Sequence, residues 1–107
     1  MATHARFYGF VGGFRSYFVA LDIIRNNSFV VLTACEGSPA ANVTQPDRFV
    51  GVAKFLLYNV APQDGGVWFR LDIGHEVFFP FPSGPGGHLV FTPWPTPLHT
   101  YLDITVF

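Results

Sequence analysis

The fold is indicated most clearly by residues 48–73, which read RFVGVAKFLLYNVAPQDGGVWFRLDI. Two runs rich in β-branched and aromatic residues, Arg48–Val60 and Val67–Ile73, flank the segment Ala61–Gly66. Such runs favour β-strands, and a proline followed by Asp-Gly between two of them is typical of a turn. This stretch therefore predicts a β-hairpin.

The rest of the chain repeats this arrangement of apolar runs separated by turn residues. Gly12-Gly13 and Asn26-Asn27 both suit tight turns, because glycine and asparagine tolerate positive φ angles. No segment combines a 3.6-residue apolar period with helix-capping residues, so little helix is expected. About eight strands are expected, at residues 5–11, 14–25, 28–34, 48–60, 67–73, 76–81, 88–92 and 98–107.

Short strands joined by turns and a few long connections predict an all-β fold. We expect one domain over residues 1–107, an antiparallel β-sandwich of jelly-roll or Greek-key type. A small β-barrel is the alternative, because the same strand pattern can close on itself. The longest polar connection is 36–47, and a loop of that length in a small domain is often functional.

The composition indicates self-association. Only 12% of the 107 residues are charged, against about 25% in an ordinary soluble domain. Half of the residues are hydrophobic and 13 are phenylalanine, while a short domain buries only roughly two-thirds of its surface. Some of these side chains must face outward, and exposed apolar area usually marks a ligand, a partner or a second copy. We therefore expect a homo-oligomer.

Several classes of partner and compartment are disfavoured. The formal net charge is −1 and the charges are scattered, which argues against a nucleic-acid-binding surface. No apolar run approaches the ~20 residues of a transmembrane helix, and the N-terminus lacks the pattern of a signal peptide. A single cysteine, Cys35, excludes an intrachain disulfide. These features together favour a cytoplasmic protein.

Two predicted strands carry aromatic and polar side chains at alternate positions, which places those side chains on one face of each strand. They are Trp68, Arg70 and Asp72 in one strand and His99, Tyr101 and Asp103 in the other. Carbohydrate-binding sites use this combination, because the ring covers the apolar face of a sugar while polar groups bind its hydroxyls. A role in the core or in a subunit interface is the alternative for Trp68 and Tyr101.

Trp94 is a further candidate for ligand binding. It lies between Pro93 and Pro95, which stiffen the backbone on both sides of it. A stiff loop that presents the indole outward would lose little conformational entropy when a ligand binds. Trp94 is therefore expected to face solvent and to contribute to a lectin-like site.

Metal sites are only weakly indicated. The tripeptide Leu-Asp-Ile occurs three times and places Asp22, Asp72 and Asp103 late in predicted strands. Three converging carboxylates would suit calcium, but the unequal spacing argues against a structural repeat, and strand alternation alone explains the pattern. The residues His75, Glu76, His88 and His99 are ligand types without a metal-binding spacing. No cofactor is predicted, and calcium stays an open possibility.

The sequence thus favours a non-catalytic, self-associating binding module with a lectin-like function. No nucleophile elbow or phosphate-binding loop is present. One alternative is a small β-barrel enzyme with an aromatic-lined pocket. Its acid and base residues would include at least two of His75, His88, His99, Asp72 and Asp103. The other alternative is a structural coat or assembly protein.

Overall fold

The computed structural model describes residues 2–38, 44 and 47–107, and these residues form seven strands and no helix. The all-β prediction is therefore confirmed. No helix in the described part of the chain is long and apolar enough to cross a membrane. The strands are β1 (Thr3–Val11), β2 (Phe14–Ala20), β3 (Val30–Glu36), β4 (Lys54–Gln63), β5 (Gly66–Pro80), β6 (Gly87–Pro93) and β7 (Leu98–Val106).

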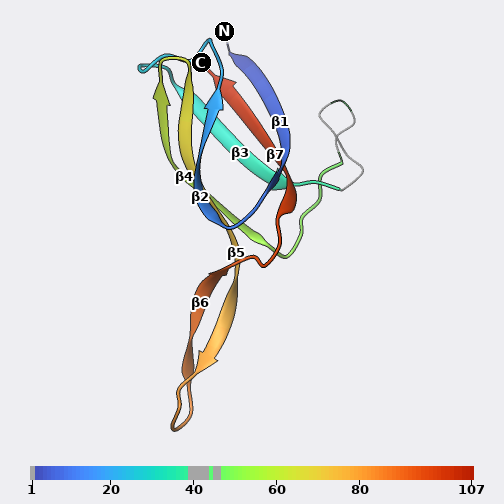
Figure 1. Cartoon of the computed structure of the whole chain (residues 1–107), viewed down its shortest axis with the longest axis vertical. Coiled ribbons are helices and arrows are strands. Elements are labelled where there is room, and N and C mark those ends of the chain that lie inside the picture. The colour runs from blue at the N-terminus through green and yellow to red at the C-terminus, as the bar shows by residue number, and fades with distance from the viewer. Residues whose placement is uncertain (1, 39–43, 45–46) are drawn as a thin grey trace.

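The strands form two antiparallel sheets (Figure 1). One sheet has the order β1–β7–β3 and the other β2–β5–β4, with β6 paired to the far half of β5. The predicted antiparallel sandwich is confirmed. The two sheets do not close into the alternative barrel, because the edge strands β1 and β2 form no ladder with each other in the described structure.

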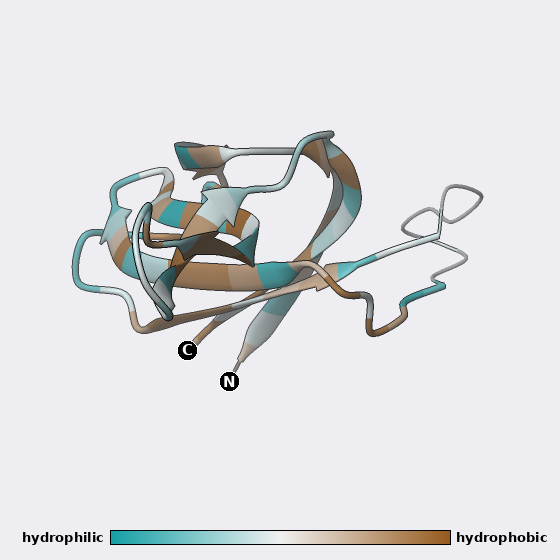
Figure 2. Ribbon diagram, turned by 90° about the horizontal axis from the view of Figure 1, so that it is seen from below, coloured by the Kyte–Doolittle hydropathy of each residue, from teal (hydrophilic) through white to brown (hydrophobic). Residues whose placement is uncertain are grey.

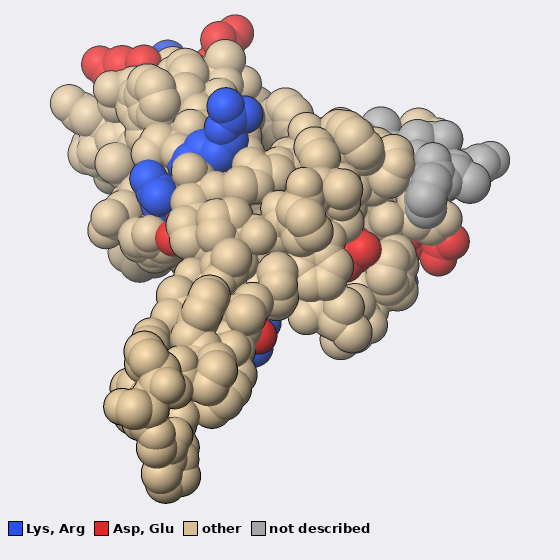
Figure 3. All heavy atoms as spheres, turned by 60° about the horizontal axis from the view of Figure 1, so that its bottom comes forward, with Lys and Arg blue, Asp and Glu red and all other residues tan. Residues whose placement is uncertain are grey.

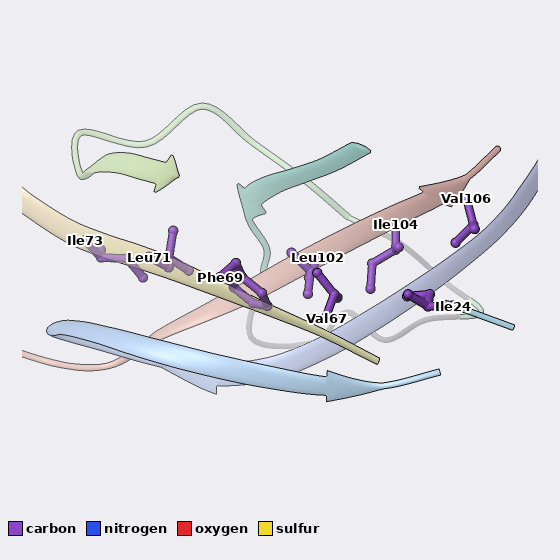
Figure 4. Packing of buried hydrophobic residues seen from close by; sticks show 8 residues of the cluster. All are labelled: Ile24, Val67, Phe69, Leu71, Ile73, Leu102, Ile104 and Val106. Atoms are coloured by element: carbon purple, nitrogen blue, oxygen red, sulfur yellow. The ribbon is translucent and has the colours of Figure 1, made fainter. Parts of the chain in front are cut away.

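The core lies between the central strands of the two sheets, β5 and β7. Alternate side chains of each strand point inward, as the two-residue period of a strand requires, and Figure 2 shows hydrophobic and hydrophilic bands alternating along the strands. Ile24, from the connection after β2, is fully buried with them. The core residues are Ile24, Val67, Phe69, Leu71, Ile73, Leu102, Ile104 and Val106 (Figure 4).

The structure has seven strands where about eight were expected, because the runs 67–73 and 76–81 form the single strand β5. Gly74 does not interrupt the strand. A Cβ atom at this position would collide with the carbonyl oxygen of Thr92 on β6. Glycine is therefore needed here for the close approach of β6 and not for a turn.

The predicted hairpin of β4 and β5 is present, but its turn is shorter than the segment 61–66. β4 continues to Gln63, so that only Asp64 and Gly65 connect the two strands, with Gly65 at a φ of 90°. β4 also begins at Lys54 and not at residue 48. Its register against β5 shifts next to Asn59, which has a φ of 53°.

Two other predicted strands are also shortened. β2 ends at Ala20, and the remainder of the run 14–25 turns so that the Ile24 amide donates to the Leu21 carbonyl. β3 begins at Val30.

Most of the predicted polar connection 36–47 lies outside the described residues. Near its two ends, the Ser38 amide donates to the Asp47 carbonyl.

The far half of β5 and the whole of β6 form a two-stranded hairpin, here called the arm (residues 74–93). Its pairing runs from Gly74 with Pro93 to Pro80 with Gly87. The arm extends beyond the sandwich at the bottom of Figure 1, and the longest dimension of the molecule is 58 Å. β5 thus belongs to the sandwich core at one end and to the arm at the other.

Candidate functional site

The outer face of the β2–β5–β4 sheet, directed away from the other sheet, carries the first predicted group of site residues. Val67, Phe69 and Leu71 point into the core, so the alternate residues Trp68, Arg70 and Asp72 point outward. On β2, Phe18 pairs with Trp68 and Ser16 with Arg70. The prediction that these three β5 residues share one face is confirmed.

Asp72 is held by two neighbours. Arg70 Nε donates to Asp72 Oδ1 at 2.8 Å, and the Tyr58 hydroxyl donates to Asp72 Oδ2 at 2.7 Å. These bonds stabilise a carboxylate in a residue that is only 8% exposed. The hydrogen bond to Asp72 raises the pKa of Tyr58 and also that of Arg70. Tyr58 and Arg70 are therefore fixed in place on the sheet surface.

Trp68 forms the apolar part of the same surface. It is 46% exposed, and the Phe18 ring lies 5.1 Å from the indole at an interplanar angle of 44°. A shallow depression of about 310 Å³ lies beside the indole. Its lining consists of Ser16, Tyr58, Asn59, Trp68, Phe69 and Arg70. This group is called the Trp68 site below.

Sequence reasoning did not include Ser16, Tyr58 or Asn59. Tyr58 lies opposite Arg70 in the ladder between β4 and β5, and Ser16 lies opposite the same residue from β2. Only the register of the strands brings them together. The available signal was the alternation of Leu56 and Tyr58 along β4, which places both on one face of that strand.

The second predicted group lies on the other sheet and does not join the first. Tyr101 is 1% exposed, and its hydroxyl accepts a hydrogen bond from the Asp47 amide. A Cβ atom at Gly37 would collide with its ring. Gly37 and Asp47 thus lie against Tyr101, which supports its role as a buried residue over a role in sugar contact.

Asp103 and His99 flank Tyr101 on β7, each in a different environment. Asp103 accepts from Arg6 Nε at 2.7 Å and from Arg48 at 3.1 Å, and the hydrogen bond from Arg6 raises the pKa of that arginine. The His99 ring lies 5.8 Å from Tyr8 and 4.6 Å from Phe10. This face is organised by ion pairs and ring contacts around a buried tyrosine.

Trp94 does not face outward as expected. It is partly buried and packs against the core, and its amide donates to the Ile73 carbonyl at 2.9 Å. The rings of His75 and Trp94 are nearly perpendicular, with their centroids 5.1 Å apart. The indole therefore lies against the core and the base of the arm, and the expectation that Trp94 faces solvent was wrong.

The structure does not unite the three aspartates considered for calcium. Asp22 follows β2, whereas Asp72 and Asp103 belong to different sheets and are bound by arginines. Among residues 2–38, 44 and 47–107, no group of three or more His, Cys, Asp or Glu side chains is placed to hold a metal ion. His88 lies apart from the other candidates, near the rings of Phe79 and Phe81 in the arm.

The enzyme alternative required two of five acid–base candidates in one pocket. Asp103 lines one of four well-formed depressions of the described residues, and none of these four is lined by two candidates. Cys35 donates through its Sγ to the carbonyl oxygens of Glu36 and Phe49, at 3.4 and 3.7 Å. Since no depression among these four brings two acid–base candidates together, the Trp68 site is the best arrangement for binding in the described structure.

A comparison of the chain with protein-family models, curated proteins and solved structures finds no match in any of the three. The functional argument therefore rests on the residues described above.

Proposed function

We propose that this chain is a non-catalytic β-sandwich binding module that self-associates and binds a carbohydrate at the Trp68 site. The observation that carries the ligand proposal is the exposed Trp68 indole beside the hydrogen-bonded group of Arg70, Asp72 and Tyr58. An apolar ring and fixed polar groups on one surface match the two chemically different faces of a sugar ring.

The polar groups are positioned before any ligand arrives. Asp72 accepts from both Arg70 and Tyr58, so these long side chains are already restrained. A ligand that binds restrained side chains loses less conformational entropy than one that must order them. Ser16 and Asn59 add a hydroxyl and an amide at the margin of the depression. Together they offer both donors and acceptors to sugar hydroxyls.

A shallow site suits one or two sugar units and a modest affinity. The depression is open and lies on a sheet face, so most of a bound sugar would stay in contact with water. Stacking on the Trp68 indole would supply the apolar contact, and hydrogen bonds would set the orientation. An affinity in the range from about 10 μM to 1 mM, or roughly 4–7 kcal/mol, fits such a contact.

The test is binding of the full chain to an immobilised panel of mono- and oligosaccharides, followed by calorimetry with the best ligand. Trp68→Ala should abolish binding while circular dichroism stays unchanged, because Trp68 lies outside the core. Phe10→Ala, which removes a 64% exposed ring from the other sheet, is the matched control. Wild-type protein that binds no sugar, or a folded Trp68→Ala variant that binds normally, would overturn the ligand proposal.

A structural assembly protein is the second candidate function. It is favoured by the arm, which carries exposed phenylalanines beyond the sandwich. Self-association is common to both candidates, and they differ in whether the Trp68 site has a ligand. The surface that would join the copies follows from the chemistry of the arm.

A further inference from the structure

The arm exposes apolar side chains without nearby charge. Residues 77–93 contain no Asp, Glu, Lys or Arg, and Figure 3 shows charged atoms only at the base of the arm. There, Glu76 pairs with Lys54 at 2.8 Å. The exposed large side chains are Phe78 (57%), Phe79 (45%), Phe81 (51%), Leu89 (62%) and Val90 (37%).

The backbone of the arm is also incompletely partnered. The ladders of β5 with β4 and β2 end at Gly74 and Asp72, so among the described residues the strand pairs only with β6 beyond Gly74. An isolated two-stranded hairpin is marginally stable in water and gains stability from further packing. β5 runs through the sandwich and the arm as one strand, and the arm extends away from its own sandwich (Figure 1). Further packing for the arm would therefore come from another molecule.

The sandwich offers an apolar cavity at its open side, between the edge strands β1 and β2. This cavity, called the β1–β2 pocket, has a volume of about 140 Å³. An apolar cavity of about 150 Å³ in another protein admits benzene, so the volume suits a phenylalanine ring. Nearly all of its lining is hydrophobic, from Phe7, Tyr8, Gly9, Val11, Tyr17, Phe69, Leu71, Thr100 and Leu102.

We propose that the arm of one copy docks on a second copy of this chain and inserts a phenylalanine ring into the β1–β2 pocket. The inference deepens the self-association part of the proposed function by naming both surfaces. Docking of the arm can be tested independently of sugar binding, because the two surfaces lie far apart. Phe78 follows Trp68 by ten residues on one strand, which spans about 33 Å.

The available area favours two reciprocal contacts. The exposed parts of Phe78, Phe79 and Phe81 amount to roughly 300 Å² if each phenylalanine contributes about 200 Å² in full. Leu89 and Val90 add to this area. One such contact is smaller than the ~800 Å² that each partner contributes to a standard interface. In a two-fold dimer each copy contributes an arm and a pocket, which brings the area close to that value.

The chemistry favours a second copy over a lipid surface. The arm has no cationic side chain beyond its ion-paired base, and the chain carries a net charge of −1, so nothing attracts it to anionic lipids. The pocket, in contrast, supplies an apolar surface of the size of one ring. Vesicle binding nevertheless provides a clear opposing outcome for the test.

The first measurement is the solution mass of the full chain by light scattering. The expected result is a dimer, with twice the 11.9 kDa mass of the chain. The double variant Phe78→Ser/Phe81→Ser should be monomeric. Phe29→Ser, which removes a 72% exposed ring from the sandwich, is the matched control and should stay dimeric. A monomeric wild type at 100-fold varied concentration would overturn the proposal.

The second variant fills the pocket. Gly9 lines it, and a Cβ atom there would meet nothing within 4 Å, so a side chain can start from this position, and Gly9→Leu should fill part of the pocket. Gly9→Leu should also be monomeric, with an unchanged circular dichroism spectrum. A dimer that survives Gly9→Leu would overturn the role of the pocket, even if the arm variant is monomeric.

Mixing the two variants gives the sharpest test. The arm variant keeps its pocket and the pocket variant keeps its arm, so a 1:1 mixture should regain one of the two contacts and form, at high protein concentration, a heterodimer that is weaker than the wild-type dimer. Association that depends on arm–arm contact would show no such complementation and would overturn the proposal. The arm would instead be assigned to membranes if the wild-type chain is monomeric and binds phosphatidylcholine vesicles, and if the arm variant does not bind them. Sugar binding by Gly9→Leu should be unchanged.

Discussion

Arg70 and Asp72 lie two residues apart on the outer face of β5, and Arg70 Nε donates to Asp72 Oδ1 at 2.8 Å. Successive outward positions on a strand are neighbours, so this pair forms within one strand and needs no turn or loop to bring it together. Tyr58 joins it from β4 and occupies the second carboxylate oxygen. The shape of the Trp68 site therefore depends on a carboxylate that is only 8% exposed and does not itself line the depression.

Asp72→Asn should loosen this site without unfolding the chain. The amide keeps the shape of the side chain but removes the negative charge that Arg70 and Tyr58 bind, so both side chains become more mobile. We expect weaker sugar binding, by about tenfold, and a small fall in the melting temperature. Calorimetry and differential scanning fluorimetry measure these effects. Sugar affinity equal to that of the wild type would show that Asp72 does not position the site.

Alkaline pH should destabilise the fold in part through Tyr58. The hydrogen bond to Asp72 raises the pKa of Tyr58 above its ordinary value of 10.0, and burial does the same for Tyr17. Their contribution is complete below pH 10 and is lost as the pH rises through the higher folded-state pKa values. Absorbance titration of phenolate should show Tyr58 ionising at lower pH in Asp72→Asn, with Tyr58→Phe identifying its signal. An unchanged titration would contradict the hydrogen bond.

Much of the fold follows from the sequence because strand alternation and turn residues are local signals. The hairpin at Asp64-Gly65 and the alternation of Trp68 and Arg70 with core residues were both predictable. The break expected between residues 73 and 76 is absent, because glycine occurs both in turns and at strand positions that another backbone approaches closely, and Gly74 is of the second kind. Only the position of Thr92 distinguishes the two.

The site was predicted in part for a related reason. Trp68, Arg70 and Asp72 share one strand, whereas Tyr58 and Ser16 reach them only through the register of neighbouring strands. The burial of Tyr101 depends on a segment distant in sequence, which alternation cannot indicate. Sequence pattern thus defines faces of strands, and tertiary contacts decide which faces stay open.

The requirement for glycine at position 74 can be tested against a glycine in a second strand. Gly74→Ala places a Cβ atom against the Thr92 carbonyl, which should lower the free energy of unfolding by about 1–3 kcal/mol. Gly9→Ala meets open space and should leave stability unchanged or raise it by up to about 1 kcal/mol. Urea unfolding measures both. Equal effects would contradict the close approach of β6 to β5.

The core between β5 and β7 should tolerate truncation poorly. Ile73 and Ile104 are fully buried, so Ile73→Ala or Ile104→Ala should each cost about 2–5 kcal/mol of unfolding free energy. Val50→Ala is the control, because Val50 is fully exposed and its truncation creates no cavity. Urea unfolding in which the two isoleucine variants resemble the control would contradict the position of the core.

The two tryptophans should report different environments. Trp68 is 46% exposed on the outer face of β5, whereas Trp94 packs against the core and the His75 ring. In Trp94→Phe, the remaining Trp68 should emit at longer wavelength and be quenched several-fold more strongly by acrylamide than Trp94 in Trp68→Phe. A bound sugar should protect only Trp68. Quenching that is equal in both variants would contradict these positions, and sugar protection of Trp94 alone would place the ligand at the base of the arm.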